Sequence, residues 1–394
     1  MPRIAEKKAD QATIRRINMS AVLRLLRERG TLARADLAKE LGITRNTASN
    51  IVAELLNAGV VIETEFRREG AGRPGLLLEM ATNKSFSIGA EIDISRIMVV
   101  ALDFKAKILW KESISITPKQ SQERIIATTE QLVQSALDWG KQENMQPLGI
   151  GLGLAGLVDA QGSCLVYAPY LNWKNVPFKT MWEEKFSIPV FLDNEANAAA
   201  LCYYNYTDRL NALNLAYISI GVGMAAGLVL EGHLFRGTGG FAGQAGHMKI
   251  RPDGESCRCG DQGCWSTEVG LTAFSRKTDG KPVNPDEVAQ SFRFGETALE
   301  NVTDEMAEML GLGIVNLINL FNLDTVILGG AMRPILPFML KKTKEVVNRR
   351  ALSQPCANVQ IKVSGRDDDA VCGAACLVLD AFINDPLPLV RAES

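Results

Sequence analysis

Four potential metal ligands lie close together in the middle of the chain. His247 is followed by Cys257, Cys259 and Cys264, and two glycines lie within the short loop that the cysteines define. Three thiolates and one imidazole can complete the tetrahedral shell of Zn²⁺, and glycines allow so short a loop to turn around an ion. A shell closed by four protein ligands is structural rather than catalytic. The spacing therefore predicts a structural Zn²⁺ site at these four residues; the alternative is a reduced loop whose cysteines hold no metal.

The first 80 residues have the spacing of a helix-turn-helix. Apolar residues recur at helical intervals over residues 11–29, and Gly30 follows as a stop. A short helix is predicted over 33–40, then a turn at Gly42 and a third helix that Thr44 caps and that runs through residue 56.

The third predicted helix has one polar face and one apolar face. The polar face carries short donors and acceptors and one arginine, which suit base edges and phosphates. These predicted DNA-binding residues are Thr44, Arg45, Asn46, Thr47, Ser49 and Asn50. The predicted core face consists of Ala48, Ile51, Val52 and Leu55.

Two short strands around a charged tip are predicted after Gly59, which gives the head a wing. The tip contains Arg67 and Arg68 and ends in a Gly-Arg-Pro-Gly segment. Arg73, held in that stiff extended segment, suits the narrow minor groove, where the negative potential is strongest. A DNA-binding winged head is therefore predicted; the alternative is a three-helix protein-interaction module with a solvated hairpin.

Charge is distributed unevenly along the chain. The net charge of -2 over 394 residues gives no overall basic field for nucleic acid. Residues 1–80, however, hold 14 basic and 10 acidic residues, whereas the remainder holds 29 and 35. A basic head on an acidic body agrees with nucleic-acid contact through the head.

The sequence carries no signal for a membrane or for secretion. Residues 1–10 are polar, and the most apolar later run, residues 311–332, is interrupted by three asparagines and an aspartate. The cysteines outside the cluster are scattered among apolar neighbours, as in reduced cytosolic proteins. We expect a cytoplasmic protein with no membrane partner.

Beyond residue 81 strands alternate with helices in two rounds. The first round is predicted as strands over 86–94, 96–103, 108–116 and 148–154 with a helix over 121–142. The second is predicted as strands over 218–221, 226–231 and 325–328 with a helix over 304–321. Two similar half-domains with a cleft between them fit this order, which by itself leaves function open.

Three segments together resemble the ROK family, named for repressors, open reading frames and kinases. They are the metal loop with CRCGDQGC at 257–264, the segment DNEANAAA at 193–200, and the winged head ending in Gly-Arg-Pro. Among the family's repressors, xylose-repressor-like members are similar at Leu171-Asn172-Trp173. The resemblance implies an α/β, actin-like (ribonuclease-H-like) two-lobed body that binds a sugar and controls a DNA-binding dimer. The implied domains are 1–80 for the head, 81–200 plus 375–394 for the first lobe, and 201–374 for the second lobe with the zinc loop.

The family includes sugar kinases, but this chain departs from their pattern. Its first phosphate loop reads Asp93-Ile94-Ser95-Arg96, where kinases are rich in Gly and Thr, and its second reads Gly221-Val222-Gly223 in place of Gly-Thr-Gly. Bulky residues remove the close backbone approach that phosphate needs. Asn194-Glu195 replaces the kinases' Asn-Asp, which displaces the carboxylate by about one methylene. We expect a sensor and not an enzyme.

Carried over by position, the resemblance implies six sugar-binding residues. They are Gly156, Asn172, Asn194, Glu195, Gln244 and His247. His247 would bind zinc through one ring nitrogen and a hydroxyl through the other. Gln244 and Ser266 replace two glutamates that are common in the family, and Glu268 is the nearest acid that could compensate.

The sequence thus predicts a sugar-responsive transcriptional regulator that binds a palindromic operator as a dimer or a higher homo-oligomer. The resemblance favours a repressor of carbohydrate-utilisation genes, and an activator with the same parts is the alternative. One recognition helix contacts too few bases for selective binding, so two are required. One alternative is an ATP-dependent sugar kinase with an accessory DNA-binding head. Another is a sensor that works by binding a second protein.

Overall fold

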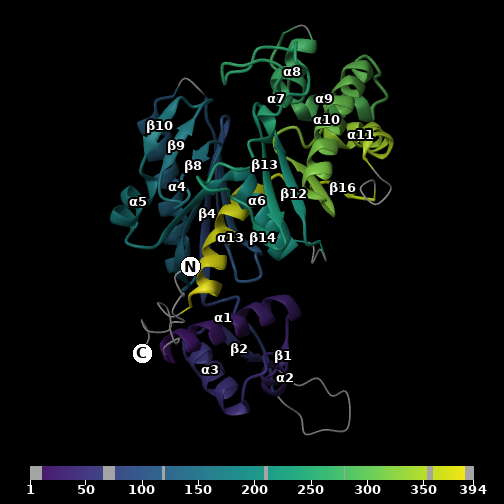
Figure 1. The fold of residues 1–394 in the computed structure, drawn as a ribbon. Coiled ribbons are helices and arrows are strands. Elements are labelled where there is room, and N and C mark those ends of the chain that lie inside the picture. The colour runs from purple at the N-terminus through teal and green to yellow at the C-terminus, as the bar shows by residue number, and fades with distance from the viewer. Residues whose placement is uncertain are drawn as a thin grey trace, which may run out of the picture.

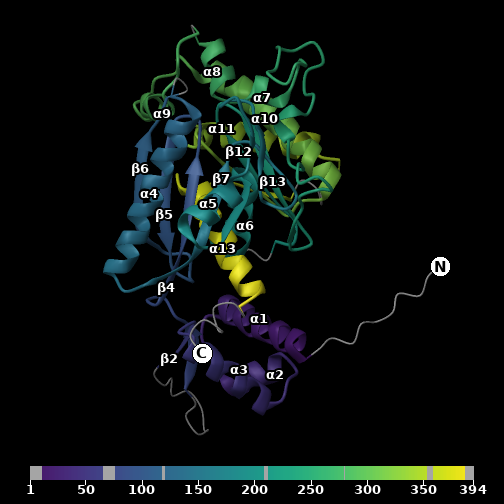
Figure 2. The same cartoon turned by 90° about the vertical axis from the view of Figure 1, so that its left-hand side faces the viewer.

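The computed structural model describes residues 11–64, 76–117, 120–207, 212–278, 280–352 and 358–386. A small head lies at one end of a two-lobed body, and the last helix, in yellow, runs from between the lobes down to the head (Figure 1). Figure 2 shows the same arrangement from the side, with the head below both lobes.

The head contains the predicted helix-turn-helix and wing strands. Its elements are α1 (Gln11–Arg29), β1 (Leu32–Ala33), α2 (Arg34–Glu40), α3 (Arg45–Asn57), β2 (Val61–Thr64) and β3 (Leu77–Met80), with the strands in the order β1-β3-β2. Thr44 caps α3, because its hydroxyl accepts a hydrogen bond from the Thr47 amide at 3.1 Å. The predicted core face of α3 is buried as expected. The wing tip, with Arg67, Arg68 and Arg73, lies outside the described residues.

The first lobe is built on a five-stranded mixed sheet in the order β11-β7-β4-β5-β6. Its elements are β4 (Ser85–Ile92), β5 (Arg96–Leu102), β6 (Ile108–Ser115), α4 (Gln122–Gln142), β7 (Gln146–Leu154), β8 (Leu157–Val158), β9 (Leu165–Ala168), β10 (Trp173–Val176), α5 (Phe178–Phe186) and β11 (Val190–Asn194). β4 and β7 are buried along almost their whole length, as expected for strands that are covered on both faces. The four strands and one helix predicted here are confirmed to within a few residues.

The second lobe repeats this plan with a sheet in the order β14-β13-β12-β15-β16. Its elements are β12 (Leu215–Ile220), β13 (Met224–Leu230), β14 (His233–Leu234), the 3₁₀ helix η2 (Ala245–His247), α7 (Trp265–Glu268), α8 (Leu271–Lys277), α9 (Pro285–Arg293), α10 (Glu300–Phe321), β15 (Thr325–Gly329), α11 (Leu336–Arg350) and β16 (Gln360–Val363). Its core surrounds Trp265 and Phe274, both fully buried. The three strands and the long helix predicted here are also confirmed.

Two helices pack together between the sheets. They are α6 (Glu195–Cys202), which continues into the π-helical turn η1 (Tyr203–Thr207), and α13 (Asp369–Asn384). A methyl group placed on Gly373 of α13 would lie 2.3 Å from the carbonyl group of Ala198 in α6. Gly151 of β7 and Gly227 of β13 would clash in the same way with the backbones of α13 and α6. The two lobes are therefore held at backbone contact through these helices.

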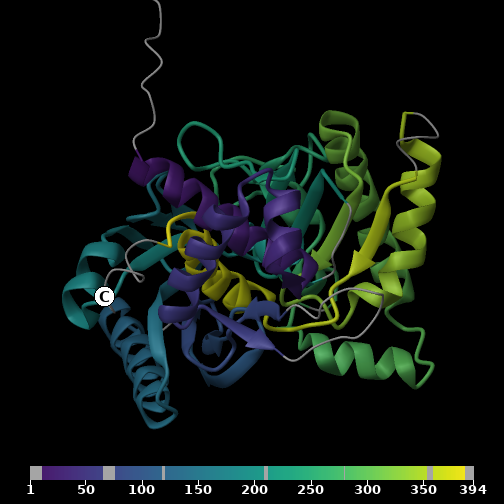
Figure 3. The ribbon, with the colours of Figure 1, turned by 90° about the horizontal axis from the view of Figure 1, so that it is seen from below.

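The head is packed against the far end of α13. Seen from below, the purple helices of the head cross over the yellow α13 (Figure 3). Met19, Leu23 and Leu26 of α1 share one buried apolar cluster with Leu379 and Phe382 of α13. The head is thus docked on the body through a dry core and not tethered by a linker alone.

Within the parts of the chain that the structure describes, no helix is both long enough and apolar enough to span a bilayer.

Replacing Gly373 by alanine tests the close contact of α6 and α13. Alanine stabilises a helix by about 1 kcal/mol relative to glycine, so helix propensity alone predicts that the variant is more stable. We expect instead a lower free energy of unfolding, by about 1–3 kcal/mol or more, because the new methyl group would meet the Ala198 backbone. Chemical denaturation measures the change.

Gly365→Ala is the matched control, since a methyl group there meets no atom within 4 Å. A Gly373→Ala protein as stable as the Gly365→Ala protein would contradict the proposed tight crossing.

Candidate functional site

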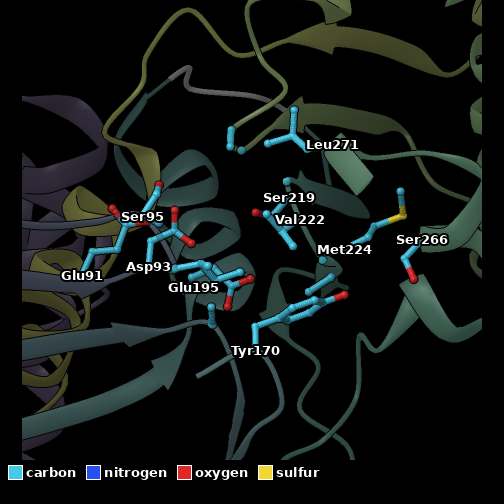
Figure 4. A pocket seen from close by; sticks show the side chains of 18 of the residues that line it. Glu91, Asp93, Ser95, Tyr170, Glu195, Ser219, Val222, Met224, Ser266 and Leu271 are labelled. Atoms are coloured by element: carbon cyan, nitrogen blue, oxygen red, sulfur yellow. The ribbon is translucent and has the colours of Figure 1, made fainter. Parts of the chain in front are cut away.

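A cavity of about 830 Å³ lies between the two lobes, at the place where the sequence predicts a cleft. This volume is within the range of small-molecule binding sites. Carboxylates from the first lobe, including Glu91, Asp93 and Glu195, face Ser219 and Val222 of the second lobe (Figure 4). The cavity therefore has hydrogen-bonding groups on the side of the first lobe and both polar and apolar side chains on the side of the second lobe.

The structure brings five of the six predicted sugar contacts to this cavity. Gly156, Asn194, Glu195, Gln244 and His247 line it. Asn172 does not, because it forms the exposed turn between β9 and β10 and has a left-handed backbone with φ of 56°. Asparagine is common at such left-handed turn positions, so Asn172 has a backbone role here, and its sugar contact stays a prediction.

Asn194 positions its neighbours in the cavity wall. Its side-chain oxygen caps α6 by accepting a hydrogen bond from the Ala196 amide at 2.9 Å. Its side-chain nitrogen donates to the Gly156 carbonyl at 3.1 Å and to Oε2 of Glu195 at 2.6 Å. The amide is thus largely occupied within the protein, and it fixes the direction of the Glu195 carboxyl group.

Glu195 and Glu91 are held in the neutral form more readily than ordinary glutamates. Burial raises the pKa of Glu195 to about 8, and the charges of Asp93 and Glu91 act in the same direction. Burial also raises the pKa of Glu91 to about 7, against the opposing effect of Arg96. A neutral carboxyl group can both donate and accept a hydrogen bond, which matches the two roles of a sugar hydroxyl.

Arg96 lines the cavity, in the segment predicted from the resemblance to correspond to the kinases' first phosphate loop. Its guanidinium lies 3.7 Å from the Glu91 carboxylate and donates to the backbone carbonyl of Asp367 at 2.6 Å. Asp367 precedes α13, so Arg96 ties the first lobe to the segment that leads into this helix. Sequence reasoning identified Arg96 only as a departure from the kinase pattern and missed its partner, which is 271 residues away.

The four predicted metal ligands converge on one point. Their ligand atoms all lie within 4.8 Å of one another. The Sγ atoms of Cys259 and Cys264 are 3.7 Å apart, as are Sγ of Cys257 and Nδ1 of His247. Zn–S bonds of about 2.3 Å at tetrahedral angles would place two sulfurs about 3.8 Å apart. The residues therefore fit a metal ion of this kind.

Lys249 and His247 complete the surroundings of the metal cluster. The Lys249 ammonium donates to Sγ of Cys264 at 3.2 Å and pairs with Asp261 at 2.6 Å. Nδ1 of His247 faces the cluster, so Nε2 is the ring nitrogen left for the cavity that His247 lines.

Ser266 lines the cavity, but Glu268 does not take the place of the missing glutamate. Glu268 is buried and lies 3.5 Å from Arg251, to which it is paired. Glu268, two residues beyond Ser266 in α7, is not among the residues that line the cavity. The pocket thus has a short hydroxyl where the family commonly has an acid.

The predicted DNA-binding residues lie on one end of α3. Thr44, Arg45, Asn46 and Asn50 are exposed, and Thr47 and Ser49 are half-buried. The hydroxyl groups of Thr44 and Thr47 lie 2.8 Å apart, so both contribute to the helix cap as well as to the exposed surface. Arg73 lies outside the described residues.

We predict one equivalent of Zn²⁺ per chain and its loss in a Cys264→Ser variant, because three remaining ligands cannot close the shell. Elemental analysis after gel filtration measures the metal. Cys164→Ser, a thiol outside the cluster, is the control and should retain the metal. Native protein without stoichiometric zinc would overturn the prediction.

The raised pKa of Glu195 predicts a pH-dependent stability. Between its ordinary value of 4.5 and about 8, the folded chain holds a proton that the unfolded chain releases. Stability should therefore fall as pH rises through this window, and Glu195→Gln should reduce the fall. Thermal unfolding midpoints at pH 5 and pH 8.5 measure it.

A Glu112→Gln variant, changed at an exposed glutamate, serves as the control. Its unfolding midpoint should fall between pH 5 and pH 8.5 as much as that of the wild type. An equal fall in Glu195→Gln would show that the Glu195 carboxyl group titrates normally.

Comparison with known proteins agrees with the fold. The model of the ROK family matches residues 87–381, and a winged helix-turn-helix DNA-binding model matches residues 15–62. A xylose repressor of Caldicellulosiruptor bescii is 28% identical over 390 residues, which cover 95% of this chain and 98% of the relative.

Two solved structures show the same fold. A ROK family transcriptional regulator, described as a homologue of the Escherichia coli MLC protein, aligns with a TM-score of 0.82 at 22% identity over 96% of this chain and 98% of its own. A ROK family glucokinase from Streptomyces griseus, in complex with glucose and AMPPNP, aligns with a TM-score of 0.64 at 24% identity over 74% and 99%. The predicted winged head and two-lobed α/β body are confirmed, and the chain belongs to the ROK family.

Proposed function

We propose that this chain is a sugar-responsive transcriptional repressor that binds operator DNA through α3 and the wing and binds a sugar in the cavity between the lobes. The family match, the winged head and relatives named as xylose repressors support this function. D-xylose is accordingly the first effector to test. Zn²⁺ at the His247 and cysteine cluster is proposed as a structural ion that orients the His247 ring toward the sugar.

The observation that carries the proposal is the course of α13. Asp369 and Ala370, at its beginning, line the cavity. Leu379 and Phe382, near its end, lie in the core of the head. A helix of 16 residues spans about 24 Å as one rigid element, so a change at the cavity reaches the head directly.

A polar clamp holds the head at the end of α13. Arg27 of α1 pairs with the Asp380 carboxylate at 2.7 Å, and its guanidinium lies 5.3 Å from the centre of the Tyr206 ring. Asn205 donates to the same Asp380 oxygen at 3.1 Å. The clamp joins α1 to α13 and to η1, which follows α6. It therefore connects the head to both of the helices that cross between the lobes.

Sugar control of DNA binding then follows from a change in lobe angle. A dimer must place two α3 helices in successive major grooves, at a spacing of about 34 Å or a multiple of it. Closure of the lobes on a sugar would shift α13 and the docked head, and so change that spacing. The sugar releases DNA only if it binds the state that does not bind operator more tightly. We propose a homodimer as the smallest assembly that can act in this way.

A sugar kinase is the second candidate, because the Streptomyces griseus glucokinase shares the fold of the body. The pairing of Arg96 with Glu91 and with the backbone of Asp367 weighs against it, because Arg96 belongs to the segment that the resemblance compares with a phosphate loop and is already paired within the protein. If the protein released ADP at enzymatic rates when given a sugar and ATP, it would be a kinase and not a sensor.

The function is tested by selecting bound duplexes from a random DNA pool with the full-length protein, followed by binding assays with D-xylose and a panel of mono- and disaccharides. We expect a palindromic site whose binding is lost in an Arg45→Ala variant and reduced by at least one sugar. No enriched sequence, or binding unaffected by every sugar, would contradict the proposed function.

Replacing Arg27 by alanine should separate DNA binding from sugar control. The variant removes the clamp on Asp380, while α3 and its exposed residues remain. We expect operator affinity within a few-fold of the wild type and a sugar effect reduced from the usual range of about 5- to 150-fold toward none. Operator titrations with and without sugar measure both quantities.

Arg29→Ala is the control of equal charge, because Arg29 pairs with Glu40 inside the head and not with the body. It should keep the full sugar effect. An undiminished effect in Arg27→Ala would contradict transmission through the clamp.

A further inference from the structure

Tyr170 reaches from the first lobe to the second across the cavity. It lies in the turn between β9 and β10, is half-buried and lines the cavity. The Arg258 guanidinium of the metal loop lies 5.1 Å from the centre of its ring. Figure 4 shows the ring extending from the Glu195 side of the cavity toward Ser266. The ring thus contacts an element of the opposite lobe from within the cavity wall.

The edge of the same ring lies against the turn after β12. A methyl group placed on Gly223 would lie 2.7 Å from Cε2 of Tyr170, closer than side chains approach one another. A side chain at position 223 would therefore displace the Tyr170 ring from this contact.

Arg258 stands between two of the metal ligands. Cys257 and Cys259 flank it directly, and the loop closes with a hydrogen bond from the Cys257 amide to the Asp261 carbonyl at 2.6 Å. A metal bound by both neighbours fixes the backbone from which the Arg258 side chain extends. The position of the guanidinium over the Tyr170 ring depends on the conformation of this backbone.

We propose that Arg258 and Tyr170 form a latch across the cavity, that the bound metal sets the latch, and that the latch controls how fast a sugar leaves. The part that concerns sugar rests on the proposed function, whereas the latch itself does not. A cation over an aromatic ring at a partly exposed site changes an equilibrium by about two- to fivefold. The metal loop thus serves ligand retention as well as the local fold.

Hydrogen exchange without any sugar tests the latch. In zinc-loaded full-length protein, amides of residues 165–176 are compared before and after chelation. We expect chelation to speed their exchange about two- to fivefold in the wild type, although these residues bind no metal. In Arg258→Ala, confirmed to hold zinc, exchange should be fast already and should not respond to chelation.

Lys174→Ala is the matched control. It removes a cation 5.4 Å from the Tyr167 ring, a contact within the first lobe, and should respond to chelation as the wild type does. Unchanged exchange in the chelated wild type, or an Arg258→Ala protein that still responds, would overturn the latch.

Sugar dissociation provides the second arm, with D-xylose as the probe or else the sugar that the panel identifies. Tyr170→Ala and Gly223→Ala, both zinc-loaded, should each release it about two- to fivefold faster than the zinc-loaded wild type. Release at the wild-type rate from both variants would contradict the role in retention. If no sugar binds the wild type, the proposed function fails. The hydrogen-exchange experiment still tests the latch in that case, because it uses no sugar.

Discussion

The contact between α6 and α13 is the constraint on which the rest of the structure depends. Gly373 lets the two helix backbones touch, and glycines in β7 and β13 let each helix sit equally close to a sheet. Because protein interiors are densely packed, such contacts transmit small displacements instead of absorbing them. The cavity lies at one end of α13 and the head at the other, so α13 is the element through which the proposed rotation of the lobes would move the head.

Much of the fold could be predicted from local pattern. The cap at Thr44, the apolar face of α3 and the alternation of strands with helices are properties of neighbouring residues, and all are present. The docking of the head on α13 could not be predicted in this way. Arg27 and Asp380 are separated by 353 positions, and no sequence motif around either residue indicates that the two form a pair.

The candidate site was predictable where residue type alone limits the chemistry. Three cysteines and a histidine at short spacing have few uses, and the structure brings their ligand atoms together. Tyr170 and Glu91 gave no such signal, because an aromatic residue in a turn and an acid at a strand end serve many purposes. Their roles depend on Arg258, Gly223 and Arg96, which only the tertiary fold places beside them. Asn172 was predicted as a sugar contact from its position in a motif, whereas in the structure it forms an exposed turn outside the cavity lining.

The most direct test of the account is calorimetric titration of sugar into the protein with and without a saturating operator duplex. If α13 couples the cavity to the head, operator must weaken sugar binding by the same factor by which sugar weakens operator binding, because linkage is reciprocal. We predict equal factors of at least about fivefold. A sugar affinity that is identical in the presence and absence of operator would contradict the coupling.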